Sequence, residues 1–217
     1  MKKNTISTFT ASPADYMQAI KNKGEILIRF NSMSRELESV IIKILHRYLE
    51  EYDILYMKNP ILNIMKELMN NAVKANMKRL YFNLKHLDIN SPKDYEKGML
   101  SFKADTYSRD NTGDDGLFDK LEESGLYVTI SFKSTEKDLS ISVANNIPIL
   151  DSELKKVKER IAKAYEYNDI SDAFDDVTDD SEGAGLGLIM AMMLFKNSGL
   201  RSDCARTRSC PALQHRN

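Results

Sequence analysis

The sequence predicts an α/β fold in which helices pack on a sheet that is at least partly antiparallel. Residues 24–30 alternate apolar and polar side chains, as half-buried strands do. Two further alternating runs, 127–133 and 139–145, flank a short polar turn and predict an antiparallel hairpin. Apolar side chains at helical spacing over 34–51, after the capping residue Ser34, and over 59–78 predict two long amphipathic helices ahead of the hairpin.

The composition is that of a globular chain with one sizeable core. The 217 residues are 42% hydrophobic and 29% charged, and the net charge of -1 offers no basic stripe for a nucleic acid. No apolar run approaches the roughly 18 residues of a membrane span, and none near the start resembles a signal peptide, so we expect a cytoplasmic protein. Cys204 and Cys210 both lie near the end, which leaves the core without a disulfide framework or a paired metal-ligand spacing.

The helix predicted over 59–78 carries the first motif. Asn59 followed by Pro60 is a helix-start signal. One face is apolar, and the other collects polar side chains: Asn63, Glu67, Asn70, Asn71, Lys74 and Lys78. An ordinary solvated face would explain this pattern. Asparagine is a mediocre helix former, however, so several asparagines around one carboxylate also favour a ligand or metal site.

The segment after this helix predicts another strand and then a long insertion. Residues 80–84 predict the strand, and 86–125 are largely polar. Short helices are expected over 92–102 and 117–124, with a disordered middle. We interpret 86–125 as a surface insertion without chemistry of its own.

Asn145 closes the second strand of the hairpin. Leu139, Ile141 and Val143 share one face, and the two-residue period places Asn145 on that same side. A buried side-chain amide can donate and accept, which suits the edge of an adenine. A bond from Asn145 to its own turn explains the residue equally well.

A helix, an acidic loop and a glycine-rich turn follow. Residues 151–168 predict a helix, and the acidic loop 171–182 lacks the ligand spacing of a calcium loop, which favours a solvated segment. The turn from Gly183 to Leu188 contains three alternate glycines and leads into an apolar helix over 189–196. Glycines at a helix N-terminus let backbone amides approach a phosphate closely. The turn lacks the ending of a Walker loop and follows no strand, which excludes a P-loop and a dinucleotide fold.

In order and context, these segments resemble the GHKL ATPase superfamily, which includes DNA gyrase, the heat-shock chaperone ATPase, the mismatch-repair protein MutL and sensor histidine kinases. Glu67-x-x-x-Asn71-Ala72-x-Lys74 resembles the N box of that family. Gly183-x-Gly185-x-Gly187-Leu188 resembles its second glycine box. The place of the first glycine box is taken by residues 145–149, where Asn145 replaces the adenine-reading aspartate and Ile147 and Ile149 replace both glycines.

The resemblance implies a two-layer α/β sandwich of the Bergerat type, with a mixed, largely antiparallel sheet and helices on one face. ATP would lie between the layers. The ATP-binding domain would span 24–199, with 86–125 as the insertion and 151–182 as a lid over the nucleotide. Residues 1–23 would be an N-terminal tail, and 200–217 an atypical C-terminal tail.

The resemblance also implies roles for individual residues. Asn71 would coordinate the Mg²⁺ that bridges the phosphates of ATP, and Lys74 would face a phosphate. Asn145 would read the adenine, and the glycine-rich turn would close over the phosphates through Gly183, Gly185, Leu186 and Gly187. Glu67 would be the catalytic base, acting on water or on a serine hydroxyl.

Three activities fit these expectations. The first is a signalling protein kinase, histidine-kinase-like or anti-sigma-factor-kinase-like, that transfers the γ-phosphate of ATP to a protein partner; a homodimer would be in keeping with it. His46 lacks the acidic residue and proline usual after a phosphoacceptor histidine, so the acceptor is expected elsewhere. The second is a non-catalytic, nucleotide-regulated adaptor with a degenerate site. The third is an ATP hydrolase, although the large transducer domain of those enzymes is missing.

Overall fold

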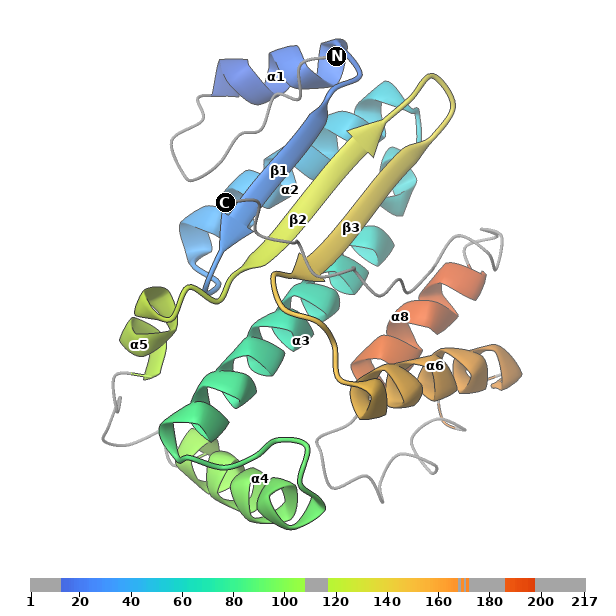
Figure 1. Ribbon diagram of the computed structural model, residues 1–217. Helices are drawn as coiled ribbons and strands as arrows, with labels where there is room; N and C mark the ends of the chain where they lie inside the picture. Colours follow the sequence, from blue (N-terminus) through green and yellow to red (C-terminus); the bar gives the residue numbers. More distant parts are fainter. Residues whose placement is uncertain (1–12, 108–116, 168, 170, 172–185, 198–217) are drawn as a thin grey trace.

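The computed structural model describes residues 13–107, 117–167, 169, 171 and 186–197, which form a mixed α/β fold (Figure 1). Its sheet has three strands, all antiparallel, in the order β1-β2-β3. The strands are β1 (Glu25–Phe30), β2 (Val128–Ser134) and β3 (Leu139–Asn145). The predicted first strand and hairpin are confirmed, and the described residues add no parallel strand.

Helices make up most of the remaining described chain. They are α1 (Pro13–Lys21), α2 (Arg35–Glu51), the 3-10 helix η1 (Leu55–Met57), α3 (Lys58–Leu84), α4 (Pro92–Tyr107), α5 (Leu117–Glu123), α6 (Asp151–Glu166) and α8 (Leu186–Asn197). Ser34 caps α2 as predicted, because its side-chain oxygen accepts a hydrogen bond from the Leu37 N–H at 3.1 Å. No helix in the described part of the chain has the length and apolarity needed to cross a membrane.

The main core lies between the sheet and the two long helices α2 and α3. In Figure 1, α2 and the first part of α3 lie behind the sheet, and α3 continues beyond it. The strand register pairs Ile26 with Phe132 and Ile28 with Ile130, so the alternate residues of both strands face the helices. Tyr48 of α2 stacks on Phe132, with ring centroids 5.7 Å apart. The period-2 pattern of the strands therefore buries one face of the sheet under the helices.

Helix α3 differs from its prediction at both ends. It begins at Lys58, so Asn59 lies inside the helix instead of capping it, and it continues to Leu84 through the predicted strand 80–84, which is wrong. Leu80, Tyr81 and Phe82 are all buried. The rings of Tyr81 and Phe82 pack against Phe102 and Tyr95 of α4, at centroid distances of 5.4 and 5.9 Å. Because this end of α3 is covered on more than one side, its apolar residues form a continuous run that resembles a buried strand.

Two segments that we expected to lie outside the core contribute to it. Helix α1, within the expected N-terminal tail, buries Tyr16, Ala19 and Ile20. Helix α5, within the expected surface insertion, buries Leu117 and Leu121 in the same core. The expected helices of that insertion are confirmed as α4 and α5. The expected disordered middle, between those two helices, is wrong for residues 103–107, which continue α4, and residues 108–116 lie outside the described residues.

Gly98 lets α4 approach α3 closely. A Cβ atom at this position would fall within 2.9 Å of three atoms of the Phe82 ring, which is almost fully buried. We expect Gly98→Ala to lower the free energy of unfolding by about 1–3 kcal/mol through overpacking. This should occur although alanine favours a helix by roughly 1 kcal/mol over glycine. Urea unfolding would measure the change, with Lys97→Ala on the exposed side of α4 as control. A Gly98→Ala protein at least as stable as the wild type would contradict the close packing.

Candidate functional site

Glu67 and Asn71 lie one turn apart in the middle of α3. Residues four apart share one face of a helix, and the Asn71 Nδ2 donates a hydrogen bond to the Glu67 Oε1 at 2.9 Å. Glu67 is half-buried and Asn71 is exposed. Because Asn71 donates through its nitrogen, its carbonyl oxygen is left as a hard ligand atom.

The first turn of α8 lies directly against the Glu67 carboxylate. A Cβ atom at Gly187 would fall within 2.5 Å of the carboxyl carbon and of both carboxyl oxygens of Glu67. Any other side chain at 187 would therefore displace the carboxylate. The fold thus brings the third glycine of the turn next to the acidic residue of α3, although the two are far apart in sequence.

Asn145, at the end of β3, is attached to the next turn of α3. Its Nδ2 donates to the backbone oxygen of Ala72 at 2.8 Å and to the Oδ1 of Asn76 at 2.6 Å. The side chain therefore points toward α3, on the side to which the two-residue period assigns it, and bonds the helix instead of its own turn. Its role in reading adenine stays a prediction.

Asn76, which is fully buried, was not among the predicted site residues. Its Nδ2 has no hydrogen-bond partner among the described residues. The available signal was a polar residue one turn after Ala72, on the apolar face of α3. A buried amide needs hydrogen-bond partners for both its oxygen and its nitrogen, and Asn145 supplies one for the oxygen alone.

The other predicted residues divide into two groups. Lys74 is exposed on α3, one turn after Asn71. Leu186 begins α8. Gly183 and Gly185 lie outside the described residues, as does the acidic segment 172–182. The structure therefore brings together Glu67, Asn71 and Gly187, with Asn145 beside the next turn of α3.

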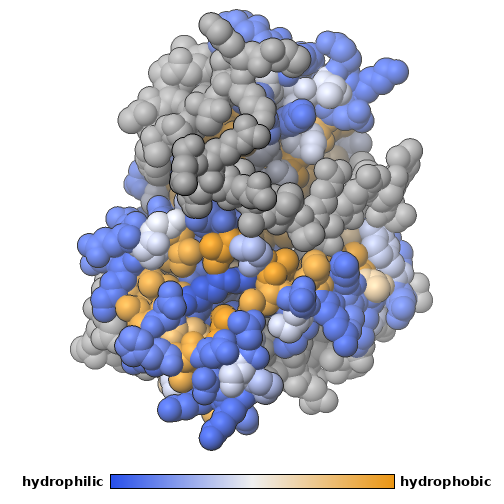
Figure 2. Space-filling view, in the orientation of Figure 1, coloured by the Kyte–Doolittle hydropathy of each residue, from blue (hydrophilic) through white to orange (hydrophobic). Residues whose placement is uncertain are grey.

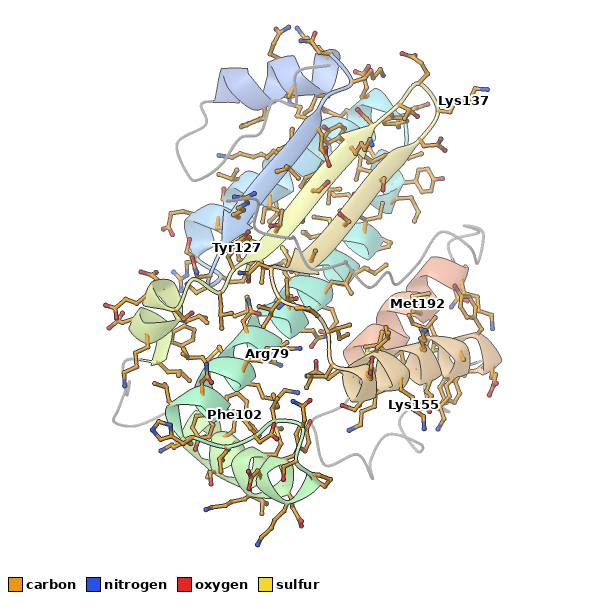
Figure 3. The ribbon with its side chains drawn as sticks, in the orientation of Figure 1. Arg79, Phe102, Tyr127, Lys137, Lys155 and Met192 are labelled. Carbon is orange, nitrogen blue, oxygen red and sulfur yellow. The ribbon has the colours of Figure 1, made fainter. Side chains whose placement is uncertain are left out.

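Helices α6 and α8 form a second, smaller apolar cluster beside α3 (Figure 1). Ala164 of α6 packs with Ile189, Met192 and Met193 of α8, and Figure 3 shows Met192 between these two helices. Lys196, in the last turn of α8, donates to the backbone oxygens of Tyr165 and Tyr167 at 2.9 and 3.0 Å. This lysine satisfies carbonyl groups at the C-terminal end of α6.

An ionic cluster joins the start of α6 to α3. Glu153 pairs with Lys78 through Oε1 and with Arg79 through Oε2, the latter at 2.8 Å. The exposed fractions of the Lys78, Arg79 and Glu153 side chains are only 11%, 13% and 17%. Burial raises the pKa of Glu153, but the charges of Lys78 and Arg79 outweigh it and hold the pKa below its usual 4.5. The cluster therefore holds the carboxylate in its charged form.

Arg79 also fixes the loop between β3 and α6. It donates to the Pro148 backbone oxygen at 3.1 Å, and the Leu150 N–H donates to Glu153 at 3.3 Å. This loop occupies the place of the expected first glycine box, and Figure 3 shows Arg79 on α3. On the face of the molecule that Figure 2 shows, hydrophilic and apolar side chains are interspersed over the lower part.

Comparison with known proteins identifies a relative without a described activity. An uncharacterized protein of Treponema pallidum (strain Nichols) is 34% identical to this chain over 190 residues, which is 87% of this chain. The chain spans 36% of the length of that relative. No protein-family model matches the sequence, and no solved structure matches it. The geometry around α3 therefore carries the information on function.

Proposed function

We propose that this chain is an ATP-binding module of the GHKL type that acts as a signalling protein kinase. The observation that carries the proposal is the contact of Gly187 with the Glu67 carboxylate, to which Asn71 also donates. Residues of the two motifs that resemble the N box and the second glycine box thus meet in space. The antiparallel sheet, with α2 and α3 on one face, supports a two-layer sandwich of the Bergerat type.

The residues suit Mg-ATP. No group of three or more His, Cys, Asp or Glu side chains in the described part of the chain could hold a metal by itself. Mg²⁺ commonly takes one or two protein ligands and completes its shell with phosphate oxygens and water. The Asn71 Oδ1 would be the protein ligand, and Lys74 would face a phosphate. Backbone amides at the start of α8 would favour the negative charge of the phosphates.

Glu67 would act as the general base. Its Oε1 accepts from Asn71, which orients the carboxylate and leaves Oε2 to take a proton. An acceptor hydroxyl would lose its proton to Glu67 as its oxygen bonds to the γ-phosphorus. The bond from that phosphorus to the β,γ-bridging oxygen breaks, and ADP leaves with the electron pair. Such transfer depends mainly on positioning and charge stabilisation. The acceptor would be a protein partner, and a cytoplasmic homodimer is part of the proposal.

Titration of Mg-ATP into the purified chain tests nucleotide binding. We expect the wild type to bind and Asn71→Ala to lose about tenfold or more in affinity, because the metal loses its protein ligand. Isothermal titration calorimetry is the measurement. Asn83→Ala is the matched control, since Asn83 is exposed on the same helix about three turns beyond Asn71. A folded wild type that binds no Mg-ATP would contradict the proposal.

A non-catalytic, nucleotide-regulated adaptor is the second candidate. The observation that favours it is the loop after β3, in which Ile147 and Ile149 occupy the expected glycine positions and Arg79 holds Pro148. Labelled ATP and candidate acceptor proteins distinguish the two. A kinase labels its partner, and an adaptor binds the partner without labelling it. Release of phosphate without any acceptor would instead indicate an ATP hydrolase.

A further inference from the structure

The amide of Asn145 is held in one orientation by α3. The Ala72 backbone oxygen can only accept, so the Asn145 group facing it at 2.8 Å must be the nitrogen. The same nitrogen lies 2.6 Å from Asn76, which must therefore present its own oxygen. Both hydrogens of the Asn145 Nδ2 are thus used within the protein. The remaining hydrogen-bonding capacity of this side chain is the acceptor Oδ1, to which the described residues donate no hydrogen bond.

Asn76 accepts this hydrogen bond although the described residues leave its own amide nitrogen unsatisfied. It is fully buried, and its Nδ2 has no partner among the described residues. A leucine would fill similar space without an unpaired donor, so packing alone does not explain an amide at this position. The oxygen that Asn76 offers to Asn145 does explain it.

We infer that Asn76 is a positioning residue that, together with the Ala72 backbone oxygen, makes the end of β3 select a base edge carrying a hydrogen-bond donor. Asparagine alone would not discriminate, because its amide can turn either its oxygen or its nitrogen toward a ligand. With the nitrogen tied to α3, an amino group such as that of adenine is accepted. A carbonyl at the same place, as in guanine or hypoxanthine, meets another acceptor. This inference depends on the proposed function.

Wild-type protein tests the selectivity without any substitution. ITP differs from ATP by a carbonyl in place of the amino group of the base. We expect calorimetry to show that Mg-ATP binds at least about tenfold more tightly than Mg-ITP, because an unpaired acceptor facing an acceptor loses a hydrogen bond. Equal affinities would overturn the inference while leaving the proposed nucleotide site intact. A folded wild type that binds neither nucleotide would overturn both.

Two substitutions test the role of Asn76. Asn76→Leu removes one of the two acceptors that hold the Asn145 nitrogen and leaves the Ala72 oxygen, so the preference for ATP over ITP should fall only in part, roughly fivefold. Asn76→Asp keeps an acceptor and should retain the preference. Met77→Leu, a buried and volume-conserving change next to it, is the control. A folded Asn76→Leu protein with the wild-type ratio of affinities would overturn the inference, because a purely structural role changes stability and not the choice of base.

Discussion

Glu67→Gln is expected to slow phosphoryl transfer about 10²- to 10⁴-fold while Mg-ATP still binds. Glutamine has nearly the same shape, and its oxygen can accept the hydrogen bond that Asn71 donates to the Glu67 Oε1 at 2.9 Å. An amide cannot take the proton of an attacking hydroxyl or water. Single-turnover transfer of labelled phosphate to the partner protein, or phosphate release in its absence, measures the rate, and calorimetry measures the binding.

Two further variants sharpen this experiment. Glu96→Gln changes an exposed carboxylate on α4 and should leave the rate unaltered. Gly187→Ala keeps the Glu67 carboxylate but forces it to move, because the new Cβ would lie within 2.5 Å of it. We expect Gly187→Ala to slow transfer as well. Turnover unchanged by Glu67→Gln would remove Glu67 as the base, whatever Gly187→Ala does.

Removing Glu153 is expected to lower the free energy of unfolding more than Gly98→Ala does. Glu153→Ala leaves Lys78 and Arg79, with exposed fractions of only 11% and 13%, without their shared carboxylate. Breaking a buried ion pair from one side costs about 3–5 kcal/mol. Because these side chains keep some contact with water, we expect a loss of about 2–4 kcal/mol. Urea unfolding measures it.

Glu159→Ala is the matched control. Glu159 lies on the same helix and pairs with Lys155 at 3.9 Å, but the exposed fractions of the two side chains are 58% and 79%. An exposed pair contributes little, so this change should stay within about 0.5 kcal/mol. Equal losses in the two variants would show that the Glu153 cluster contributes no more than a surface pair.

The same cluster sets a pH dependence with a definite sign. The pKa of Glu153 is lower in the folded protein than its ordinary 4.5, so the unfolded chain binds this proton more readily. The stabilisation is therefore fully present above about 4.5 and is lost as the pH falls through the folded pKa. Glu153→Gln should flatten the dependence of unfolding free energy on pH in that acidic range, and an unchanged slope would contradict the pairing.

Local patterns predicted the strands and most helices, because each of these segments has one buried face and clear boundary signals. The run 80–84 misled the prediction because Leu80, Tyr81 and Phe82 are buried together, and a helix covered on several sides loses its period. Helix α1 was missed for a related reason. Its buried residues are few, and its burial depends on contact with β1 and α2.

The site was predictable only in part. Spacing along α3 accounts for the pairing of Glu67 with Asn71, since residues four apart are neighbours on a helix. The two-residue period accounts for the side of the sheet on which Asn145 lies. No spacing places Gly187 against Glu67, because that contact depends on how α8 packs on α3. Asn76 was hidden because a polar residue on an apolar face reveals no partner until the opposing strand is in position.

The two apolar clusters have a consequence for how the molecule opens. The sheet, α1, α2, α5 and much of α3 share the larger cluster, whereas α6 and α8 share their own. The smaller pair packs against α3 along α8, and its contacts with α3 include the Glu153 ion pairs and the approach of Gly187 to Glu67. Regions with separate cores exchange their amide hydrogens as separate cooperative units. We therefore expect α6 and α8 to exchange their amide hydrogens as one unit before the sheet does, and a ligand bound between α3 and α8 would protect both helices at once.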